Sequence, residues 1–192
     1  MPSMLTLDAL DTRLSVPTRQ LGTPGPDPAQ LQRILRTAVR VPDHGKRLPF
    51  RFLRIAGPAR ALLAVAAAER LREREPNAGD AVVDKLRTRF LLPPLTIGVI
   101  ARLDFDEQIP ESERFSTASC VCLLLLQAAQ AEGFGAQWLT GWIAYDRPFL
   151  EGTLGLTEDE QLVGTIAIGT PLVEVPDRER PDPGDLLSDW SA

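Results

Sequence analysis

The stretch Ser112–Thr140, SERFSTASCVCLLLLQAAQAEGFGAQWLT, contains the longest expected helix of the chain and the strand that follows it. Apolar side chains surround much of the middle of residues 112–132, and a helix that is apolar on most sides is buried in a core or a subunit interface. Gly133-Phe134-Gly135 ends this helix. Residues 136–140 are predicted to form a short strand, so the segment predicts a buried helix leading directly into a sheet.

Outward from this segment, local signals predict the remaining elements. Asp27-Pro28 offers an N-cap and a preset first helical residue, and the helix that follows is broken before Pro42. Further helices are expected over residues 4–13 (with Ser3 as N-cap), 58–74, 81–92 and 147–155, and strands over 50–55, 95–101 and 163–169. No internal repeat is visible. The pattern predicts an α+β or α/β fold with about four strands, whose order it does not determine.

Composition excludes several classes of protein. The 192 residues suffice for one full-sized domain, and a net charge of -5 offers no basic field for nucleic acid or an anionic membrane surface. With one histidine and two cysteines that are two positions apart, neither a metal cluster nor a hydrolytic triad is expected. The two cysteines are interpreted as buried helix packing. Asp104 and Asp106 are expected to be solvated loop residues.

The start of the chain, residues 1–13, lacks a basic segment followed by an apolar core, so no signal peptide is expected. The longest largely apolar stretch, residues 118–131, is shorter than the roughly 20 residues that a membrane-spanning helix needs. A cytoplasmic protein with no membrane partner is therefore expected.

Short motifs in order along nearly the whole chain carry a family resemblance. They are Thr12-Arg13-Leu14-Ser15, Arg40-Val41-Pro42-Asp43-His44, Glu132-Gly133-Phe134-Gly135, Trp138-Leu139-Thr140-Gly141, Val163-Gly164, Ile168-Gly169-Thr170-Pro171 and Arg180-Pro181-Asp182-Pro183. With this set the sequence resembles the FMN-dependent nitroreductases, specifically the branch of small, single-domain bacterial NAD(P)H nitroreductases. The resemblance implies an α+β domain over residues 1–170, with a mainly antiparallel sheet of four to five strands flanked by helices and an extended C-terminal arm over 171–192.

The resemblance also implies a phosphate site for FMN near the N-terminus. In the family, the residues at the positions of Arg13 and Ser15 hold the FMN phosphate, and an arginine and a hydroxyl suit a phosphate dianion. Leu14 replaces the usual second arginine, which leaves a backbone contact and removes one guanidinium. Without the resemblance, Arg13 and Ser15 would be interpreted as a solvated arginine and a local cap.

The resemblance implies two further groups of cofactor-binding residues. Arg40 and His44 match positions that reach the cofactor, the histidine coming from the partner subunit. Trp138, Leu139 and Thr140 match the segment along the flavin ring, where a main-chain N–H can stabilise charge at N5 or O4. Taken alone, His44 would be a turn residue and Trp138 a core aromatic.

The function implied by the resemblance is that of a homodimeric flavoenzyme with FMN at the subunit interface. NADH or NADPH would donate electrons in a ping-pong mechanism to a small electron-poor acceptor such as a nitroaromatic or a quinone. No residue is assigned as catalytic, because the flavin carries the chemistry. Two alternatives remain open: an FMN-binding storage or sensor protein without efficient turnover, and a flavin-free interaction module that uses the proline-rich arm.

The tail, residues 171–192, has two interpretations. Its proline-rich, charged body cannot form a core, and chain termini are commonly disordered. Its last residues, however, include Leu186, Leu187 and Trp190, apolar side chains suited to anchoring an arm on a partner subunit.

Overall fold

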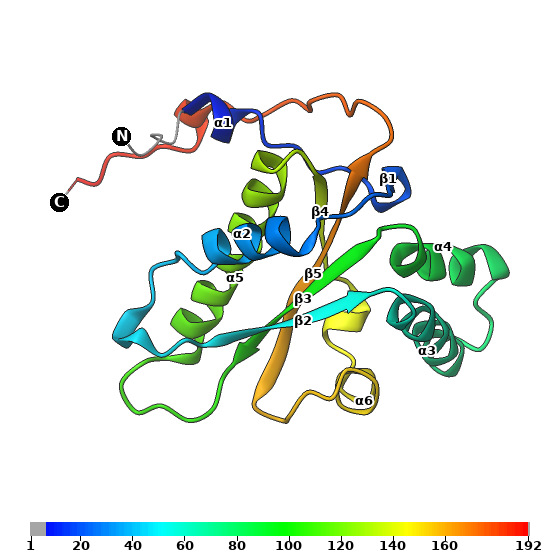
Figure 1. Cartoon of the computed structure of the whole chain (residues 1–192). Helices are drawn as coiled ribbons and strands as arrows, with labels where there is room; N and C mark the ends of the chain where they lie inside the picture. Colours follow the sequence, from blue (N-terminus) through cyan, green and yellow to red (C-terminus); the bar gives the residue numbers. More distant parts are fainter. Residues whose placement is uncertain (1–6, 192) are drawn as a thin grey trace.

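The longest strand, β5 (Glu160–Pro171), organises the sheet in the computed structural model, which describes residues 7–191 (Figure 1). The other four strands of the sheet in these residues are β1 (Leu21–Gly22), β2 (Phe50–Ala56), β3 (Leu95–Arg102) and β4 (Gly135–Leu139). β3 and β4 pair with opposite edges of β5, β2 pairs with β3, and β1 pairs with the end of β5. Every pairing is antiparallel, so the expected antiparallel α+β fold is confirmed.

Helices cover both faces of this sheet. α2 (Pro28–Ala38) and α5 (Glu111–Ala131) pack on one face, while α3 (Ala59–Arg74), α4 (Asp80–Leu91) and α6 (Arg147–Gly152) lie on the other side (Figure 1). α1 (Leu7–Asp11) is short, and the N-cap expected at Ser3 lies outside the described residues. Single 3-10 turns occur at η1 (Thr18–Gln20), η2 (His44–Lys46), η3 (Trp142–Ala144) and η4 (Pro183–Asp185).

Side-chain alternation along β3 divides the core into two parts. Ile97 and Val99 belong to the cluster beneath α2 and α5, whereas Ile100 belongs to the cluster beneath α3 and α4. Because successive side chains of a strand point to opposite faces, one apolar strand serves both clusters. The predicted N-cap of α2 is confirmed: Asp27 accepts from the amide of Gln30, whose side chain binds back to the amide of Asp27.

The long helix α5 packs against β3, β4 and β5, as its apolar middle predicts. The expectation for the cysteines is only half correct. Cys122 is buried, and burial raises the pKa of its thiol to about 12. Cys120 is exposed, because it lies on a strip of α5 that no described element covers; Leu123 on the same strip is 43% exposed.

The tail beyond β5 forms no regular structure except η4, and it turns back toward the side of the molecule that carries α1 (Figure 1). Leu186, Leu187 and Trp190 are exposed, with 87% of Trp190 accessible. Docking of this arm on a partner subunit stays a prediction. Within residues 7–191, no helix combines the length and apolarity needed to cross a membrane.

Candidate functional site

The segment that carries Arg13 and Ser15 runs in an extended conformation beside β4. The amide of Val16 donates to the carbonyl of Ala136 at 2.9 Å, and the amide of Leu14 donates to Oε1 of Gln130 on α5 at 3.1 Å. These bonds fix the segment to both elements. They also engage the Leu14 amide within the fold, so a phosphate would compete with Gln130 for that donor.

Arg13 and Ser15 open onto a cleft of about 390 Å³, which we call the Arg13 cleft. Its walls are made by the segment, α5 and β4, and its lining residues are Arg13, Ser15, Leu123, Leu126, Trp138 and Thr140. Nη1 of Arg13 donates to Oγ of Ser15 at 3.3 Å, so the two polar groups lie together at one point of the cleft. Among residues 7–191, no carboxylate forms an ion pair with Arg13, which leaves its charge available to an anion.

Trp138 forms the apolar wall of the Arg13 cleft and rests against β5. Its indole Nε1–H donates to the carbonyl of Val163 at 3.4 Å, and the ring lies over Gly164, where a Cβ would come within 2.1 Å of Nε1. The side chain thus combines the two roles expected of it, a packed aromatic and a cleft wall. The Val163-Gly164 motif gains a physical reason, because only glycine leaves room for this indole.

Thr140 follows the end of β4, and its carbonyl accepts a hydrogen bond from Nη1 of Arg89 on α4 at 2.8 Å. Arg89 also donates from Nη2 to Oγ1 of Thr165 at 3.0 Å. The side chain of Leu139 lies on the opposite face of β4 and lines a different cavity, together with Gln137. The structure therefore brings Arg13, Ser15, Trp138 and Thr140 together and turns the Leu139 side chain away from them.

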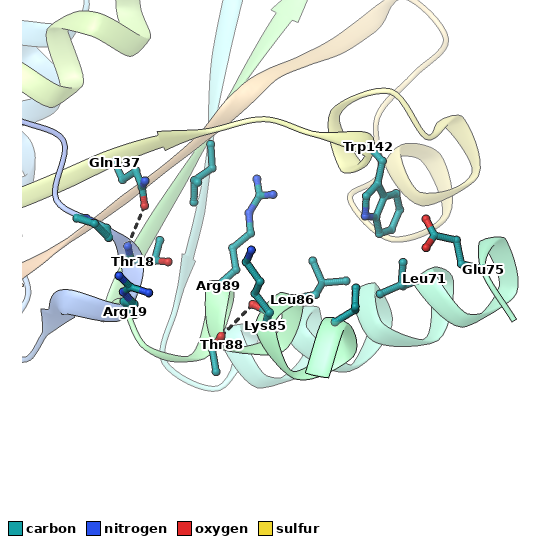
Figure 2. A pocket seen from close by; sticks show the side chains of 13 residues that line it. Thr18, Arg19, Leu71, Glu75, Lys85, Leu86, Thr88, Arg89, Gln137 and Trp142 are labelled. Carbon is teal, nitrogen blue, oxygen red and sulfur yellow. Dashed lines mark hydrogen bonds between the residues drawn. The ribbon is translucent and has the colours of Figure 1, made fainter. Parts of the chain in front are cut away.

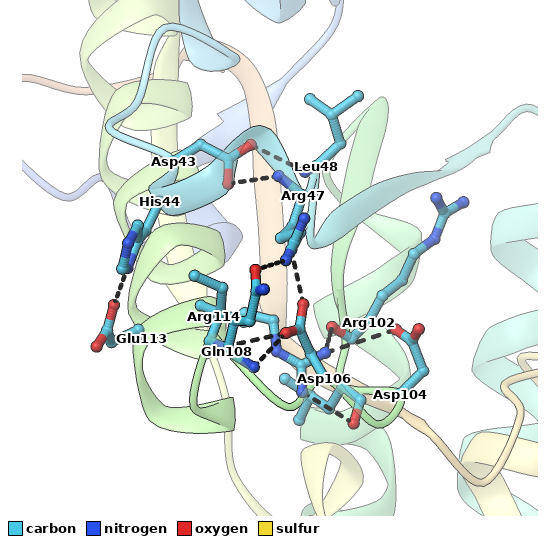
Figure 3. Close-up of polar contacts among 12 residues, drawn as sticks. Asp43, His44, Arg47, Leu48, Arg102, Asp104, Asp106, Gln108, Glu113 and Arg114 are labelled. Carbon is cyan, nitrogen blue, oxygen red and sulfur yellow. Dashed lines mark hydrogen bonds and ion pairs between the residues drawn. The ribbon is translucent and has the colours of Figure 1, made fainter.

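The His44 loop, residues 43–48, is held in an uncommon backbone conformation (Figure 3). Lys46 and Leu48 have φ values of 54° and 50°, in the left-handed region that non-glycine residues rarely adopt. The Asp43 carboxylate accepts from the amides of Arg47 and Leu48 at 3.1 and 2.8 Å, and this clamp stabilises the turn. Backbone strain that side chains hold in place is typical of functional loops.

A second set of contacts ties this loop to the 104–109 loop (Figure 3). Arg47 Nε donates to Oδ2 of Asp106 at 2.6 Å, and its Nη2 donates to Gln108 at 3.0 Å. Hydrogen bonds from the amides of Gln108 and Ile109, and then from Arg47, hold the pKa of Asp106 below its usual range. The expectation that Asp106 is merely solvated is therefore wrong, because it caps its own loop and anchors the neighbouring one.

His44 lies in a separate shallow groove of about 340 Å³, the His44 groove, lined in addition by Pro42 and the first turns of α5. His44 is exposed, and its Nδ1 lies 2.8 Å from Oε2 of Glu113. No residue lines both the His44 groove and the Arg13 cleft. Arg40 is exposed just after α2, and its side chain contacts no hydrogen-bonding or ionic partner in the described part of the chain.

Three residues that shape the site carry no signal in the sequence. Arg89, Gln130 and Glu113 lie on helices, where arginine, glutamine and glutamate are normally solvated, and their partners are 51, 116 and 69 positions away. Only the tertiary packing of α4 and α5 against the sheet brings them to the site. A group of three or more side chains that could ligate a metal does not occur among residues 7–191.

Comparison with known proteins identifies the family of this antiparallel α+β domain. The Nitroreductase family model matches residues 11–170. The Escherichia coli K12 protein named "Putative NAD(P)H nitroreductase YdjA" is 32% identical over 154 residues, which cover 79% of this chain and 81% of that protein. A similarly named Haemophilus influenzae protein is 31% identical over 87% of this chain and 89% of its own length.

Solved structures share the fold. A nitroreductase-like family protein from Bacillus cereus aligns over 100% of both chains with a TM-score of 0.81 at 24% identity. A Desulfovibrio desulfuricans nitroreductase homologue, solved in complex with FMN, aligns over 97% of both chains with a TM-score of 0.74 at 22% identity. The chain belongs to the nitroreductase family, so both the family resemblance and the enzyme class expected from the sequence are confirmed.

Proposed function

We propose that the protein is a homodimeric, FMN-dependent NAD(P)H oxidoreductase with one Arg13 cleft per subunit as its cofactor site. The observation that carries this proposal is the pairing of Arg13 and Ser15, 3.3 Å apart, at the mouth of a cleft walled by Trp138. Within residues 7–191 the Arg13 guanidinium has no carboxylate partner, and beside a hydroxyl it is a donor set suited to a phosphate dianion, while the indole offers an apolar surface to a flat ring. The residues present therefore fit FMN.

In this proposal Arg13 and Ser15 hold the phosphate, while Trp138 and the backbone at Thr140 flank the ring. Arg89 donates to the Thr140 carbonyl and so holds the main chain that would lie beside the ring. When bound, FMN would supply the redox chemistry, taking electrons from NADH or NADPH and passing them in ping-pong order to an electron-poor acceptor such as a nitroaromatic or a quinone. The homologues named NAD(P)H nitroreductases support this assignment.

The geometry of α5 supports a dimer that shares its sites. Glu113 in the His44 groove and Leu126 in the Arg13 cleft are thirteen positions apart on α5, about 20 Å along the helix axis. A two-fold axis that crosses α5 midway, at Ser119 and Cys120, would place Glu113 of one subunit opposite Leu126 of the other. Each cleft would then receive His44 from the partner subunit.

Mixed dimers test this sharing. In a heterodimer of one His44→Ala and one Arg13→Ala subunit, both lesions should fall on the same cleft and leave the other intact, so FMN titration should detect one normal and one weak site. Arg13→Ala alone should weaken FMN binding by about 1.5–3 kcal/mol, the usual worth of a hydrogen bond to a charged group. Two equally weakened sites in the heterodimer would refute the shared arrangement.

The enzyme and the storage or sensor alternative differ in turnover. Gently purified protein should be yellow and release FMN, and stopped-flow mixing with NADH or NADPH should bleach the flavin rapidly. Flavin that is bound but indifferent to both donors would favour the storage or sensor function. Released FAD, or a colourless protein that does not take up FMN, would overturn the cofactor assignment.

The C-terminal arm provides a further test of the dimer. We propose that Leu186, Leu187 and Trp190, which are exposed in the single chain, pack on the partner subunit. Burial of such side chains is worth about 1.5–3 kcal/mol each before ordering costs. Truncation after Val175 should therefore raise the dimer dissociation constant in analytical ultracentrifugation, and an unchanged constant would mean that the arm does not dock.

A further inference from the structure

A cavity of about 700 Å³ continues the proposed site on the other face of β4 (Figure 2). The segment that carries Arg13 and Ser15 runs on into η1, which lines this cavity, and β4 contributes Gln137 and Leu139. Since alternate side chains of a strand point to opposite faces, β4 lines the Arg13 cleft with one set of side chains and the cavity with the other. The residues at the ends of the cavity therefore fix the length of a molecule that enters the site.

Trp142, the first residue of η3, bounds one end of the cavity (Figure 2). Its indole lies beside Leu71 and Glu75 at the end of α3. At the opposite end, the amide of Thr18 donates to Oε1 of Gln137 at 2.8 Å. A large aromatic side chain in this place excludes longer molecules as long as it cannot rotate aside.

The Trp142 indole is held by contacts on two sides. The guanidinium carbon of Arg74 on α3 lies 4.9 Å from the centre of the indole ring, which is a cation–π contact. The ring of Phe149 on α6 meets the indole at 66° with 6.0 Å between the ring centres, which is an edge-on aromatic pair. Together these contacts oppose rotation of the indole out of the end of the cavity.

Asp146 holds both of the residues that contact the indole. Its carboxylate, which is 3% exposed, accepts hydrogen bonds from Arg74 and from Nε and Nη2 of Arg70, the latter two at 2.7 and 3.1 Å. It also accepts from the amide of Phe149 at 3.0 Å, as the N-cap of α6. Because a buried carboxylate that loses a partner leaves a costly unsatisfied charge, this arrangement keeps one geometry and fixes Arg74 and Phe149 around the indole.

We propose that Trp142 is a specificity-determining residue of the site, with Arg74 and Asp146 as the positioning residues that keep its indole at the end of the cavity. This inference rests on the proposed function and narrows it, because the electron acceptor becomes a flat molecule whose length the indole limits. Trp142 does not line the Arg13 cleft, so the phosphate contacts of Arg13 and Ser15 do not depend on it.

The length limit is tested by steady-state kinetics of the FMN-loaded protein with quinones that grow by one fused ring: 1,4-benzoquinone, 1,4-naphthoquinone and 1,4-anthraquinone. For each quinone, dividing kcat/KM of Trp142→Ala by that of wild type cancels the intrinsic reactivity of the quinone. We expect this quotient to rise by about tenfold or more from the shortest to the longest quinone, with Trp142→Phe in between. The same quotient for all three quinones would overturn the proposal. Should Trp142→Ala fail to fold, Trp142→Phe carries the same test.

Variants of Arg74 test the positioning role. Arg74→Met removes the cation over the indole and should give part of the altered quinone preference, whereas Arg74→Lys keeps the charge and should retain more of the wild-type preference. In flavin-free protein with Trp138 and Trp190 replaced by phenylalanine, Trp142 is the only tryptophan of the chain. Acrylamide should quench its fluorescence about twofold more strongly in Arg74→Met. Arg72→Gln, an exposed position on the same helix outside the cavity, is the matched control and should change neither result.

Asp146→Asn should act in the same direction as Arg74→Met, because it weakens the hold on Arg74. Normal quenching of Trp142 in both variants, or stronger quenching with an unchanged quinone preference, would overturn the positioning roles. The proposed function fails by a different result: a protein that takes up no FMN, or bound FMN that neither NADH nor NADPH bleaches.

Discussion

The contact between Trp138 and Gly164 can be tested by adding a single methyl group. In Gly164→Ala the new Cβ would lie 2.1 Å from Nε1 and 2.6 Å from Cδ1 of Trp138, and 3.0 Å from the Leu139 carbonyl oxygen. An ordinary contact begins at 3.4 Å, so the indole must move by about 1.3 Å (3.4 minus 2.1). Because β5 supports the indole from beneath, the ring can move only outward, into the Arg13 cleft.

Two effects of Gly164→Ala follow from this displacement. Overpacking of an ordered contact costs about 1–3 kcal/mol, so the free energy of unfolding should fall by that amount. The displaced indole should also narrow the cleft and weaken FMN binding by about tenfold or more, which corresponds to about 1.4 kcal/mol. Gly152→Ala is the matched control: nothing lies within 4 Å of its added Cβ at the end of α6, so FMN affinity should be unchanged and the free energy of unfolding should not fall.

A double-mutant cycle isolates the contact. In a Trp138→Ala background the indole is gone, and Gly164→Ala should cost less than about 1 kcal/mol, leaving a coupling energy of at least about 1 kcal/mol between the two positions. Urea unfolding of the FMN-saturated protein measures the stability part, and quenching of flavin fluorescence measures affinity. If the two substitutions are additive, the indole does not rest on Gly164, and the account of the cleft wall is wrong.

Three further predictions concern a buried carboxylate, the proposed dimer axis and the His44 loop. Hydrogen bonds from Arg70 and Arg74 hold the pKa of the buried Asp146 at about 2, below its value in the unfolded chain. The ionised Asp146 carboxylate therefore adds about 2 kcal/mol to the free energy of unfolding above pH 5, and this contribution is lost as the pH falls through 2. In urea unfolding, the difference in free energy of unfolding between wild type and Asp146→Asn should therefore fall by about half from pH 7 to pH 3. An equal difference at the two pH values would show that the Asp146 contribution does not come from its charge. After the native protein reacts with a short bis-maleimide, Cys120 should give a covalent dimer in denaturing gels and Cys120→Ser should not. Failure of the wild type to cross-link would place the two-fold axis elsewhere. Arg47→Ala removes the hydrogen bonds to Asp106 and Gln108, so it should release the His44 loop and weaken FMN binding about tenfold while the circular dichroism spectrum stays unchanged. Normal FMN affinity in this variant would show that the Arg47 contacts do not position the loop.

The sequence predicts most elements of the fold because their signals are local. The Asp27-Pro28 start of α2 and the apolar run of β3 depend only on neighbouring residues, and both are confirmed. β1 could not be predicted, because its two residues become a strand only by pairing with Thr170 and Pro171 of β5. β5 also begins earlier than expected, since its polar first residues, Glu160 and Gln161, are recruited by pairing with β3.

The candidate site is predictable only in part, for the same reason. Arg13, Ser15 and Trp138 could be named from motifs, and the structure places them in one cleft. Arg89 could not, because its burial depends on how α4 packs against the end of β4, and an arginine in an amphipathic helix otherwise indicates a solvated face. The opposite orientation of Leu139 follows from strand alternation, which a motif written as three consecutive residues does not express.

The family motifs combine ligands with residues that act only through packing. Glu132 binds Arg33 at 2.6 Å and joins α5 to α2, and the Thr170 hydroxyl donates to the Pro24 carbonyl at 2.6 Å and ties β5 to the loop before α2. Neither touches the Arg13 cleft, yet both belong to the pattern that located it. A phosphate site built from one arginine and one serine has no distinctive local signature, because these residues are common on every protein surface. The phosphate site becomes recognisable only through the surrounding motif residues that hold its backbone in place. A relative that kept the arginine and the serine but lost the glycine beneath the indole would therefore keep the phosphate ligands and lose the cleft.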